Sequence, residues 1–170
     1  MPKILLLSDT HNYLDKRIEK YANTCDEIWH AGDVGTISIC DELKKIKPLR
    51  AVYGNIDGQD VRKEYPKDLI FFCEEVKIYI THIGGYPNRY SLDAKKIILE
   101  TKPQLFICGH SHILKVMYDK TLSLLHINPG ACGIHGFHQM KTMVRFEITG
   151  KEIKNLEVIE LGLRSEIVTA

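Results

Sequence analysis

The sequence predicts a single-domain α/β protein, and three observations lead to this fold class. The chain has 170 residues, which is within the usual size of one domain and enough to bury a sizeable core. In its first third, short apolar segments alternate with segments of helical periodicity, a pattern typical of parallel β-α-β units. In the remainder, paired apolar segments separated by turns indicate mainly strands and hairpins. No internal repeat, low-complexity tract or linker divides the chain.

The first third of the chain is expected to form three strands and two helices. The first strand is an apolar run that stops abruptly at Asp9. A helix follows, because Leu14, Ile18 and Ala22 recur at helical spacing among charged residues. The second helix ends before Pro48. The strands are expected over residues 3–8, 27–30 and 49–53, and the second helix over 37–46.

The rest of the chain is expected to be rich in strands, with one further helix. That helix begins at Ser91, a suitable N-cap, and ends at Lys102-Pro103. The last two strands flank a turn in which Gly150 can supply a positive φ. The strands are expected over residues 69–74, 76–81, 105–108, 116–118, 122–127, 143–148 and 153–161, and the helix over 91–101.

Composition indicates a soluble, cytoplasmic protein. Hydrophobic residues make up 44% and charged residues 26%, and the net charge of +1 does not favour a nucleic-acid polymer or an anionic membrane. The early apolar run is too short for a signal peptide, and no stretch approaches the roughly 20 apolar residues that span a bilayer. The five cysteines include no Cys-x-x-Cys pair, which favours reduced and mostly buried thiols.

Potential metal ligands follow five of the expected strands. Because ligands bind at the carboxyl ends of strands in open α/β sheets, the loops that carry these residues are expected to converge on one rim. A mixture of oxygen and imidazole ligands suits Mn²⁺, Fe, Zn²⁺, Ni²⁺ or Co²⁺ better than metals that select thiolates. The candidates, in chain order, are Asp9, His11, Asp33, Asn55, His82, His110 and His112.

The spacing of these candidates also favours a metal site. Asp-x-His and His-x-His would place two ligand heads on one side of a short extended segment, since side chains alternate with period two. Glycines directly precede Asp33, Asn55 and His110, where a missing Cβ allows a sharp turn. The two aspartates could instead cap helices, but capping does not explain the accompanying imidazoles.

Taken in order, these motifs resemble the signature of the calcineurin-like metallophosphoesterase superfamily. The size of the chain and the Gly-Asn-x-Asp form look like its small single-domain branch, which includes prokaryotic phosphodiesterases and the phosphoesterase-like subunit of retromer. Asn128-Pro129-Gly130 matches a further segment of that branch, with Ala131 where serine usually follows. The matching motifs are Asp9-x-His11, Gly32-Asp33, Gly54-Asn55, His82 and Gly109-His110-x-His112, within a resemblance that spans about residues 3–130.

This resemblance implies a particular α/β architecture. The expected fold is a four-layer α-β-β-α sandwich of two mostly mixed β-sheets, with the metal site on the rim where strand ends from both sheets meet. The chain would be a single metallophosphoesterase domain over residues 1–170, with a core of about 1–162 and a loose C-terminal tail. The β-α-β pattern and the later hairpins agree with this architecture independently.

The resemblance also implies a centre of two divalent transition-metal ions, with Mn²⁺ as the first expectation and Ni, Zn, Fe, Co or Mg as alternatives. Their charge of about +4 exceeds that of two carboxylates and would attract a phosphate ester and a hydroxide. The implied reaction is hydrolysis of a phosphodiester by a hydroxide that the two ions activate. One ion would be held by Asp9, His11, Asp33 and His112, and the other by Asp33, Asn55, His82 and His110.

One position departs from the family pattern. Many family phosphatases have histidine directly after the motif asparagine, and the small branch often has cysteine, whereas this chain has Ile56. An aliphatic side chain can neither transfer a proton nor donate a hydrogen bond. Asp57 is the nearest polar side chain, and its carboxyl group could face the substrate or brace the loop. We take Asn55, His110 and Asp57 as the candidate catalytic residues.

The remaining histidines and one cysteine have plainer interpretations. His30, His126, His135 and His138 match no motif, although the last two lie in a loop that could meet substrate. Cys108 could join His110 and His112 in a zinc site if the strand stayed extended, but a turn at Gly109 favours packing of the thiol in the core.

The sequence is compatible with three functions. The first is a phosphodiesterase acting on a small phosphoester, with homo-oligomerisation possible and neither a membrane nor a nucleic-acid polymer as partner. The alternative enzyme is a phosphomonoesterase; the loss of a histidine after Asn55 favours the diester. A catalytically weak scaffold is the alternative of a different class, and in such proteins metal ligands tend to be lost.

Overall fold

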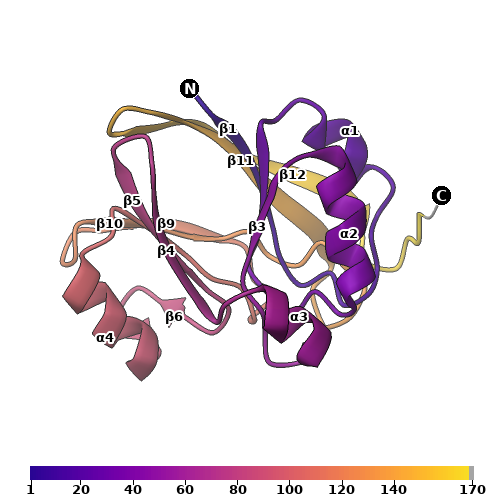
Figure 1. Cartoon of the computed structure of the whole chain (residues 1–170), viewed down its shortest axis with the longest axis horizontal. Helices are drawn as coiled ribbons and strands as arrows, with labels where there is room; N and C mark the ends of the chain where they lie inside the picture. Colours follow the sequence, from indigo (N-terminus) through magenta and orange to yellow (C-terminus); the bar gives the residue numbers. More distant parts are fainter. Residues whose placement is uncertain (169–170) are drawn as a thin grey trace.

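Two five-stranded β-sheets lie face to face in the computed structural model, which describes residues 1–168 (Figure 1). The first sheet contains β1 (Lys3–Leu7), β2 (Glu27–His30), β3 (Leu49–Ala51), β11 (Met140–Thr149) and β12 (Glu152–Leu163). Its strand order is β12-β11-β1-β2-β3. β1, β2 and β3 run parallel, as the β-α-β pattern predicts, and β11 pairs antiparallel with both β1 and β12.

The second sheet is also mixed. It contains β4 (Asp68–Cys73), β5 (Val76–Thr81), β8 (Leu105–Ile107), β9 (Lys115–Asp119) and β10 (Leu124–Asn128). Its strand order is β4-β5-β8-β10-β9, with the three central strands parallel and the two edge strands antiparallel to their neighbours.

In the described residues, four helices flank the sheets. α1 (Ile18–Ala22), α2 (Ile37–Ile46) and α3 (Gln59–Glu64) contribute buried side chains to the outer face of the first sheet. α4 (Leu92–Thr101) covers the second sheet on the opposite side of the molecule (Figure 1). Ser91 caps α4 as expected, because its Oγ accepts a hydrogen bond from the backbone N–H of Ala94 at 3.2 Å.

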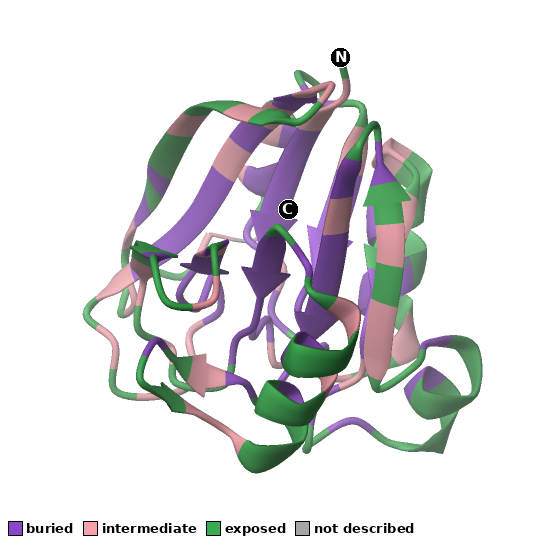
Figure 2. Cartoon of the chain, turned by 90° about the vertical axis from the view of Figure 1, so that its left-hand side faces the viewer, coloured by how far each residue is buried: buried purple, intermediate pink, exposed green. Residues whose placement is uncertain are grey.

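Alternation of side chains along the strands builds three apolar layers. Leu5 and Leu7 point toward α1 and α2, whereas Ile4 and Leu6 point toward the second sheet. In the second sheet Phe106 packs against α4, while its two neighbours on β8 face inward. Figure 2 shows the resulting buried interior between exposed outer segments. This arrangement confirms the predicted four-layer α-β-β-α sandwich of two mixed sheets.

Several short elements differ from the sequence expectation. α3 was not predicted, nor was the small hairpin of β6 (Gly85–Tyr86) and β7 (Arg89–Tyr90). β12 extends to Leu163, and the segment after it is held by hydrogen bonds: the Tyr13 hydroxyl donates to the carbonyl of Val168 at 3.1 Å. Up to residue 168 the chain end is therefore anchored, whereas a loose tail was expected; residues 169–170 lie outside the described part.

The cysteine thiols are buried, as the sequence predicts. All five cysteines lie in the described part of the chain, and each is buried and unpaired. Among residues 1–168, no helix has the length and apolar character needed to cross a membrane.

Candidate metal centre

The loops that follow β1, β2, β3, β5 and β8 meet at one edge of the sandwich. Three of these strands belong to the first sheet and two to the second, so the rim is shared between the sheets as predicted. The loops carry all seven predicted ligands: Asp9, His11, Asp33, Asn55, His82, His110 and His112.

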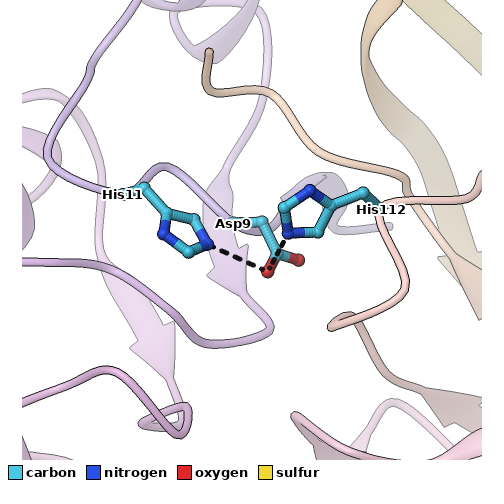
Figure 3. Close-up of side chains that lie close together, drawn as sticks. All are labelled: Asp9, His11 and His112. Atoms are coloured by element: carbon cyan, nitrogen blue, oxygen red, sulfur yellow. Dashed lines mark ion pairs between the residues drawn. The ribbon is translucent and has the colours of Figure 1, made fainter. Parts of the chain in front are cut away.

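Asp9, His11 and His112 form one group of potential ligands (Figure 3). Asp9 is fully buried, and its Oδ1 lies 3.6 Å from Nε2 of His11 and 3.2 Å from Nε2 of His112. Its Oδ2 is occupied by a hydrogen bond of 2.7 Å from the Ser8 hydroxyl and one of 3.1 Å from the backbone N–H of His110. One carboxylate oxygen is therefore fixed, and the other faces the two imidazoles.

Asp33, His82 and His110 form a second group beside the first. Asp33 Oδ2 lies 3.1 Å from Nε2 of His82 and 3.3 Å from Nε2 of His11, so this single oxygen approaches both groups. The ring of His110 packs edge-on against that of His82, with 5.3 Å between centroids. In each group, the candidate ligand atoms lie within 4.8 Å of one another.

The polar atoms at the centre of these groups fit a metal. Within residues 1–168, Asp9 Oδ1 and the Nε2 atoms of His11 and His82 are buried and make no hydrogen bond, and they face one another only as ion pairs. His82 Nδ1 lies 2.7 Å from the carbonyl oxygen of Ala31, to which a proton on Nδ1 can be donated, and this contact directs Nε2 at the centre, where it can bind a metal once it is deprotonated. Buried polar atoms without partners are costly, and a bound cation would satisfy all three.

The backbone at these ligands adopts the left-handed region. Asp9, His11, Asp33, His110 and His112 have φ between 44° and 71°. Left-handed φ costs about 1–3 kcal/mol for a non-glycine residue and persists where surrounding structure enforces it. Hence the Asp-x-His and His-x-His segments are turns, and the extended geometry assumed from their spacing was wrong. The ligand heads converge because the backbone curls rather than because side chains alternate.

Hydrogen bonds between neighbouring loops hold this conformation. The backbone N–H of Asp9 donates to the carbonyl of Gly32, and that of Gly109 donates to the carbonyl of His82, both at 3.0 Å. A Cβ at Gly109 would lie 2.2 Å from Ser8 Oγ, and one at Gly54 would lie 2.1 Å from Asp33 Oδ1. Glycine at these two positions therefore lets the loops approach the aspartates.

The electrostatics of the metal-free centre couple carboxylates to imidazoles. Burial alone would raise the pKa of Asp9, but His11 and His112 hold it well below its usual range. Burial disfavours protonation of His11, but the carboxylates of Asp33 and Asp9 favour it more strongly. The pKa of His11 therefore rises to about 9. Burial and the neighbouring His82 lower the pKa of His110. Protons thus occupy positions that a divalent cation would take, so metal binding should release them.

The loop after β3 carries Asn55 and Asp57 in different settings. Asn55 is exposed and borders the centre together with Ile56. Asp57 is buried, and its carboxylate accepts backbone N–H bonds from Gly54 at 2.7 Å, Gly35 at 2.8 Å and Val34 at 3.2 Å. This arrangement favours the bracing alternative for Asp57, while its role as an acid stays a prediction.

Two side chains around the centre were missed in the sequence. Ser8 fixes Asp9, as described above, and its position directly before the motif was the available signal. Arg62 on α3 packs over the Tyr53 ring, with 4.6 Å to the centroid, and donates to the backbone carbonyl of Asp57 at 2.6 Å and to that of Asn55 at 3.3 Å. Arg62 was missed because α3 itself was not predicted.

Two of the remaining histidines belong to neither group of candidate ligands. His30 is buried, its pKa falls to about 4 by burial, and it joins Thr10 to Gly32 through both ring nitrogens. His126 is buried beneath α4 near Phe106 and Tyr90, and neither ring nitrogen has a hydrogen-bond partner in the described part of the chain.

His135 and His138 lie at the centre, which makes them the histidines that sequence reasoning undervalued. The ring of His135 stacks on that of His11 with 4.7 Å between centroids, and His138 packs edge-on against His112 at 5.2 Å. His138 Nε2 lies 2.8 Å from the carbonyl oxygen of Gly133. The loop that carries them therefore contacts two candidate metal ligands.

Cys108 does not join the metal ligands. Its thiol donates to the carbonyl of Gly85 at 3.4 Å and lies in the layer under α4. Burial raises the pKa of both Cys108 and Cys132 to about 12. The alternative zinc site of Cys108 with His110 and His112 is not formed, and core packing, the favoured interpretation, is what the structure shows.

Two adjacent clefts open onto the centre. The larger has a volume of about 490 Å³ and contains the imidazoles of His11, His110 and His112 in its wall. The smaller has a volume of about 350 Å³ and is bordered by His82, with Asn55 shared between the two clefts. A substrate in either cleft would lie next to the candidate metal ligands.

The sandwich fold and this rim of carboxylates and imidazoles define a metal-dependent hydrolase. A family model for the calcineurin-like phosphoesterase superfamily domain matches residues 2–151, and the chain therefore belongs to that superfamily. The predicted family is thus confirmed, and the protein is a metal-dependent phosphoesterase.

Curated relatives agree with this assignment. A probable metallophosphoesterase of Methanothermobacter thermautotrophicus is 26% identical over 164 residues, covering 92% of this chain and 91% of the relative. A probable metallophosphoesterase of Methanocaldococcus jannaschii is 30% identical over 132 residues, covering 74% of this chain and 66% of the relative.

Solved structures share the fold at low sequence identity. Vps29 of Chaetomium thermophilum has a TM-score of 0.76 at 14% identity, covering 95% of this chain and 97% of that one. A structure described as a novel archaeal phosphodiesterase has a TM-score of 0.72 at 23% identity, covering 94% and 99%. Vps29 of Entamoeba histolytica complexed with Zn²⁺ has a TM-score of 0.71 at 15% identity, covering 96% and 99%.

Proposed function

We propose that the protein is a phosphodiesterase that works with two divalent transition-metal ions, Mn²⁺ first among them, on a small phosphoester in the cytoplasm. One observation carries the proposal. Two groups of three ligands lie side by side, and Asp33 Oδ2 is within 3.3 Å of Nε2 atoms on both His11 and His82. A carboxylate oxygen between two ligand sets is the arrangement that a bridging ligand requires.

The candidate ligands divide into two sets, one for each ion, and share Asp33. Asp9, His11, Asp33 and His112 would hold one ion, and Asp33, Asn55, His82 and His110 the other. The two ions together would polarise the phosphoryl oxygens and lower the pKa of a water to make it a nucleophile at neutral pH. His110 and Asn55 border the open cleft, so their side chains are within reach of a bound phosphate.

The choice of a diester rests on the side chain after Asn55. Ile56 is 47% exposed and borders the larger cleft, where it offers no proton to a leaving oxygen. The oxygen of a good leaving group needs less protonation than that of a poor one. A phosphodiester also brings only one negative charge to the centre. The archaeal phosphodiesterase with the same fold is consistent with this choice.

The experiment is a matrix of metals and substrates. Metal-stripped protein is reconstituted with Mn²⁺, Ni²⁺, Zn²⁺, Co²⁺ or Mg²⁺ and assayed on bis(p-nitrophenyl) phosphate and p-nitrophenyl phosphate. We expect the diester to be hydrolysed faster in Mn²⁺, with about 1.5–2 metal ions per chain by elemental analysis. Asn55→Ala and His110→Ala should each lower the rate at least tenfold, whereas the exposed Asn23→Ala should not. A faster reaction on the monoester, or one metal per chain at saturation, would contradict the proposal.

A further inference from the structure

The larger cleft combines candidate metal ligands with exposed apolar side chains. Phe137 is fully exposed at 102%, and Ile113 and Ile56 are 67% and 47% exposed. All three border the same cleft as His11, His110 and His112. Leaving a phenylalanine ring fully in water gives up the burial of roughly 150–250 Å² that such a ring contributes elsewhere. A bound organic group would recover that contact.

The loop that carries Phe137 is built as a fixed platform. The Arg164 guanidinium donates to the carbonyl of His138 at 2.8 Å and to that of Ile134 at 3.3 Å. Gly136 has φ of +125°, and a Cβ there would lie 2.3 Å from Nδ1 of His112. The backbone of the loop is therefore held from beneath and pressed against a candidate metal ligand, which places Phe137 beside the centre.

A second ring extends the platform. His135 is exposed and stacks on His11 at 4.7 Å with an interplanar angle of 23°, and only Gly136 separates it from Phe137 in sequence. The two rings lie on the same short loop and border the same cleft. Aromatic side chains in this arrangement suit stacking by a flat ring system.

The charged side chains that line the cleft limit the number of phosphoryl groups that a ligand can carry. Its lining contains five histidines and Asp33 but no lysine or arginine among the residues that the structure describes. Cationic side chains are the usual partners of additional phosphates. The cleft therefore offers countercharge only at the metal centre, which suits one phosphoryl group rather than a chain of them.

We infer that the larger cleft is a subsite for a planar aromatic ester group, such as a nucleoside, whose single phosphoryl group lies at the metal centre. This inference rests on the proposed function, because it names the organic part of the substrate that the same centre would hydrolyse. It makes Phe137 a residue that determines specificity, and it leaves the phosphoryl chemistry to the predicted ligands.

The test measures binding rather than turnover, using Mn²⁺-loaded protein. Titration calorimetry gives the dissociation constants of thymidine 5′-monophosphate and inorganic phosphate, which share the phosphoryl group and differ in the nucleoside. We expect the nucleotide to bind wild type more tightly than phosphate does. Phe137→Ala should weaken nucleotide binding at least about fivefold, the low end of base stacking on an aromatic ring, and leave phosphate binding unchanged. Phe137→Trp should restore nucleotide binding.

A matched control is Phe72→Ala, which removes an exposed phenylalanine on β4 outside the cleft and should change neither constant. Equal binding of the two ligands by wild type, or an equal loss of both in Phe137→Ala, would overturn the inference. Protein that shows the expected binding pattern but hydrolyses no phosphodiester would instead refute only the proposed function. Protein that hydrolyses the diester without nucleotide preference would refute only the subsite.

Discussion

Replacing Asp15 by asparagine tests the buried ion pair that anchors the C-terminal segment. Asp15 and Lys141 are both fully enclosed, with Lys141 Nζ 3.0 Å from Asp15 Oδ2 and 2.5 Å from the carbonyl of Glu166. Asp15 also accepts hydrogen bonds from the Arg17 side chain at 2.8 and 3.0 Å. The pair is therefore asymmetric, because the carboxylate has a second cationic partner and the ammonium group does not.

The size of the effect follows from this asymmetry. Asp15→Asn leaves the Lys141 charge buried with only a neutral acceptor, and breaking a buried pair in this way costs about 3–5 kcal/mol. Lys141→Met leaves Asp15 bonded to Arg17, so the loss should be nearer to about 1–2 kcal/mol. For a domain of this size, 1 kcal/mol corresponds to about 2–4 °C in melting temperature. The expected falls are thus about 6–20 °C for the first variant and about 2–8 °C for the second.

Thermal unfolding followed by circular dichroism measures both variants at pH 7 and again near pH 2. Burial opposes ionisation, but the Arg17 and Lys141 partners lower the pKa of Asp15 to about 2. A carboxyl group with a lowered pKa in the folded state stabilises above its unfolded value near 3.8, and this contribution is lost as the pH falls through 2. The difference in melting temperature between wild type and Asp15→Asn should therefore shrink below pH 4. Equal losses for the two variants at pH 7, or a gap independent of pH, would refute the reasoning.

Three further changes test other parts of the molecule. His126→Phe should stabilise by about 1–3 kcal/mol, since it removes a buried imidazole without partners, and chemical denaturation would measure the gain. Mn²⁺ at about 100 times its dissociation constant should raise the melting temperature of wild type by about 5–11 °C, reversed by EDTA and largely absent in Asp33→Asn. Asp57→Asn should destabilise the fold by about 1–3 kcal/mol, because it weakens the hydrogen bonds that the carboxylate accepts from backbone N–H groups such as that of Gly54. The exposed Asp60→Asn should change the free energy of unfolding by no more than about 0.5 kcal/mol.

Most of the fold could be predicted because its strands are short apolar runs with clear ends. The β1–β3 region and α2 follow directly from periodicity and from Pro48. α3 could not be found in this way, since Val61 is its single buried residue and six residues are too few to show a helical repeat. The hairpin of β6 and β7 has two residues in each strand, which leaves no alternation to detect.

The motifs could predict which side chains gather at this rim, whereas the shape of their loops could not be predicted. Left-handed backbone at Asp9 and His112 results from bonds to loops that lie far away in the sequence, such as the one from His110 to Asp9. The local sequence pattern does not indicate hydrogen bonds between segments that are far apart in the chain. The same holds for His135. It stacks on His11 from a loop that Arg164 holds by a hydrogen bond to the carbonyl of Ile134.

Each group of candidate ligands draws on both sheets, and this has a consequence for the order of folding. The first group joins Asp9 and His11 to His112, and the second joins Asp33 to His82 and His110. About a hundred residues separate Asp9 from His112, so closing that loop is entropically slow compared with forming the local β-α-β unit. Neither group is complete until the two sheets have docked. Metal capture should therefore be a late event in folding, and an ion once bound would hold the sheets together at their open edge.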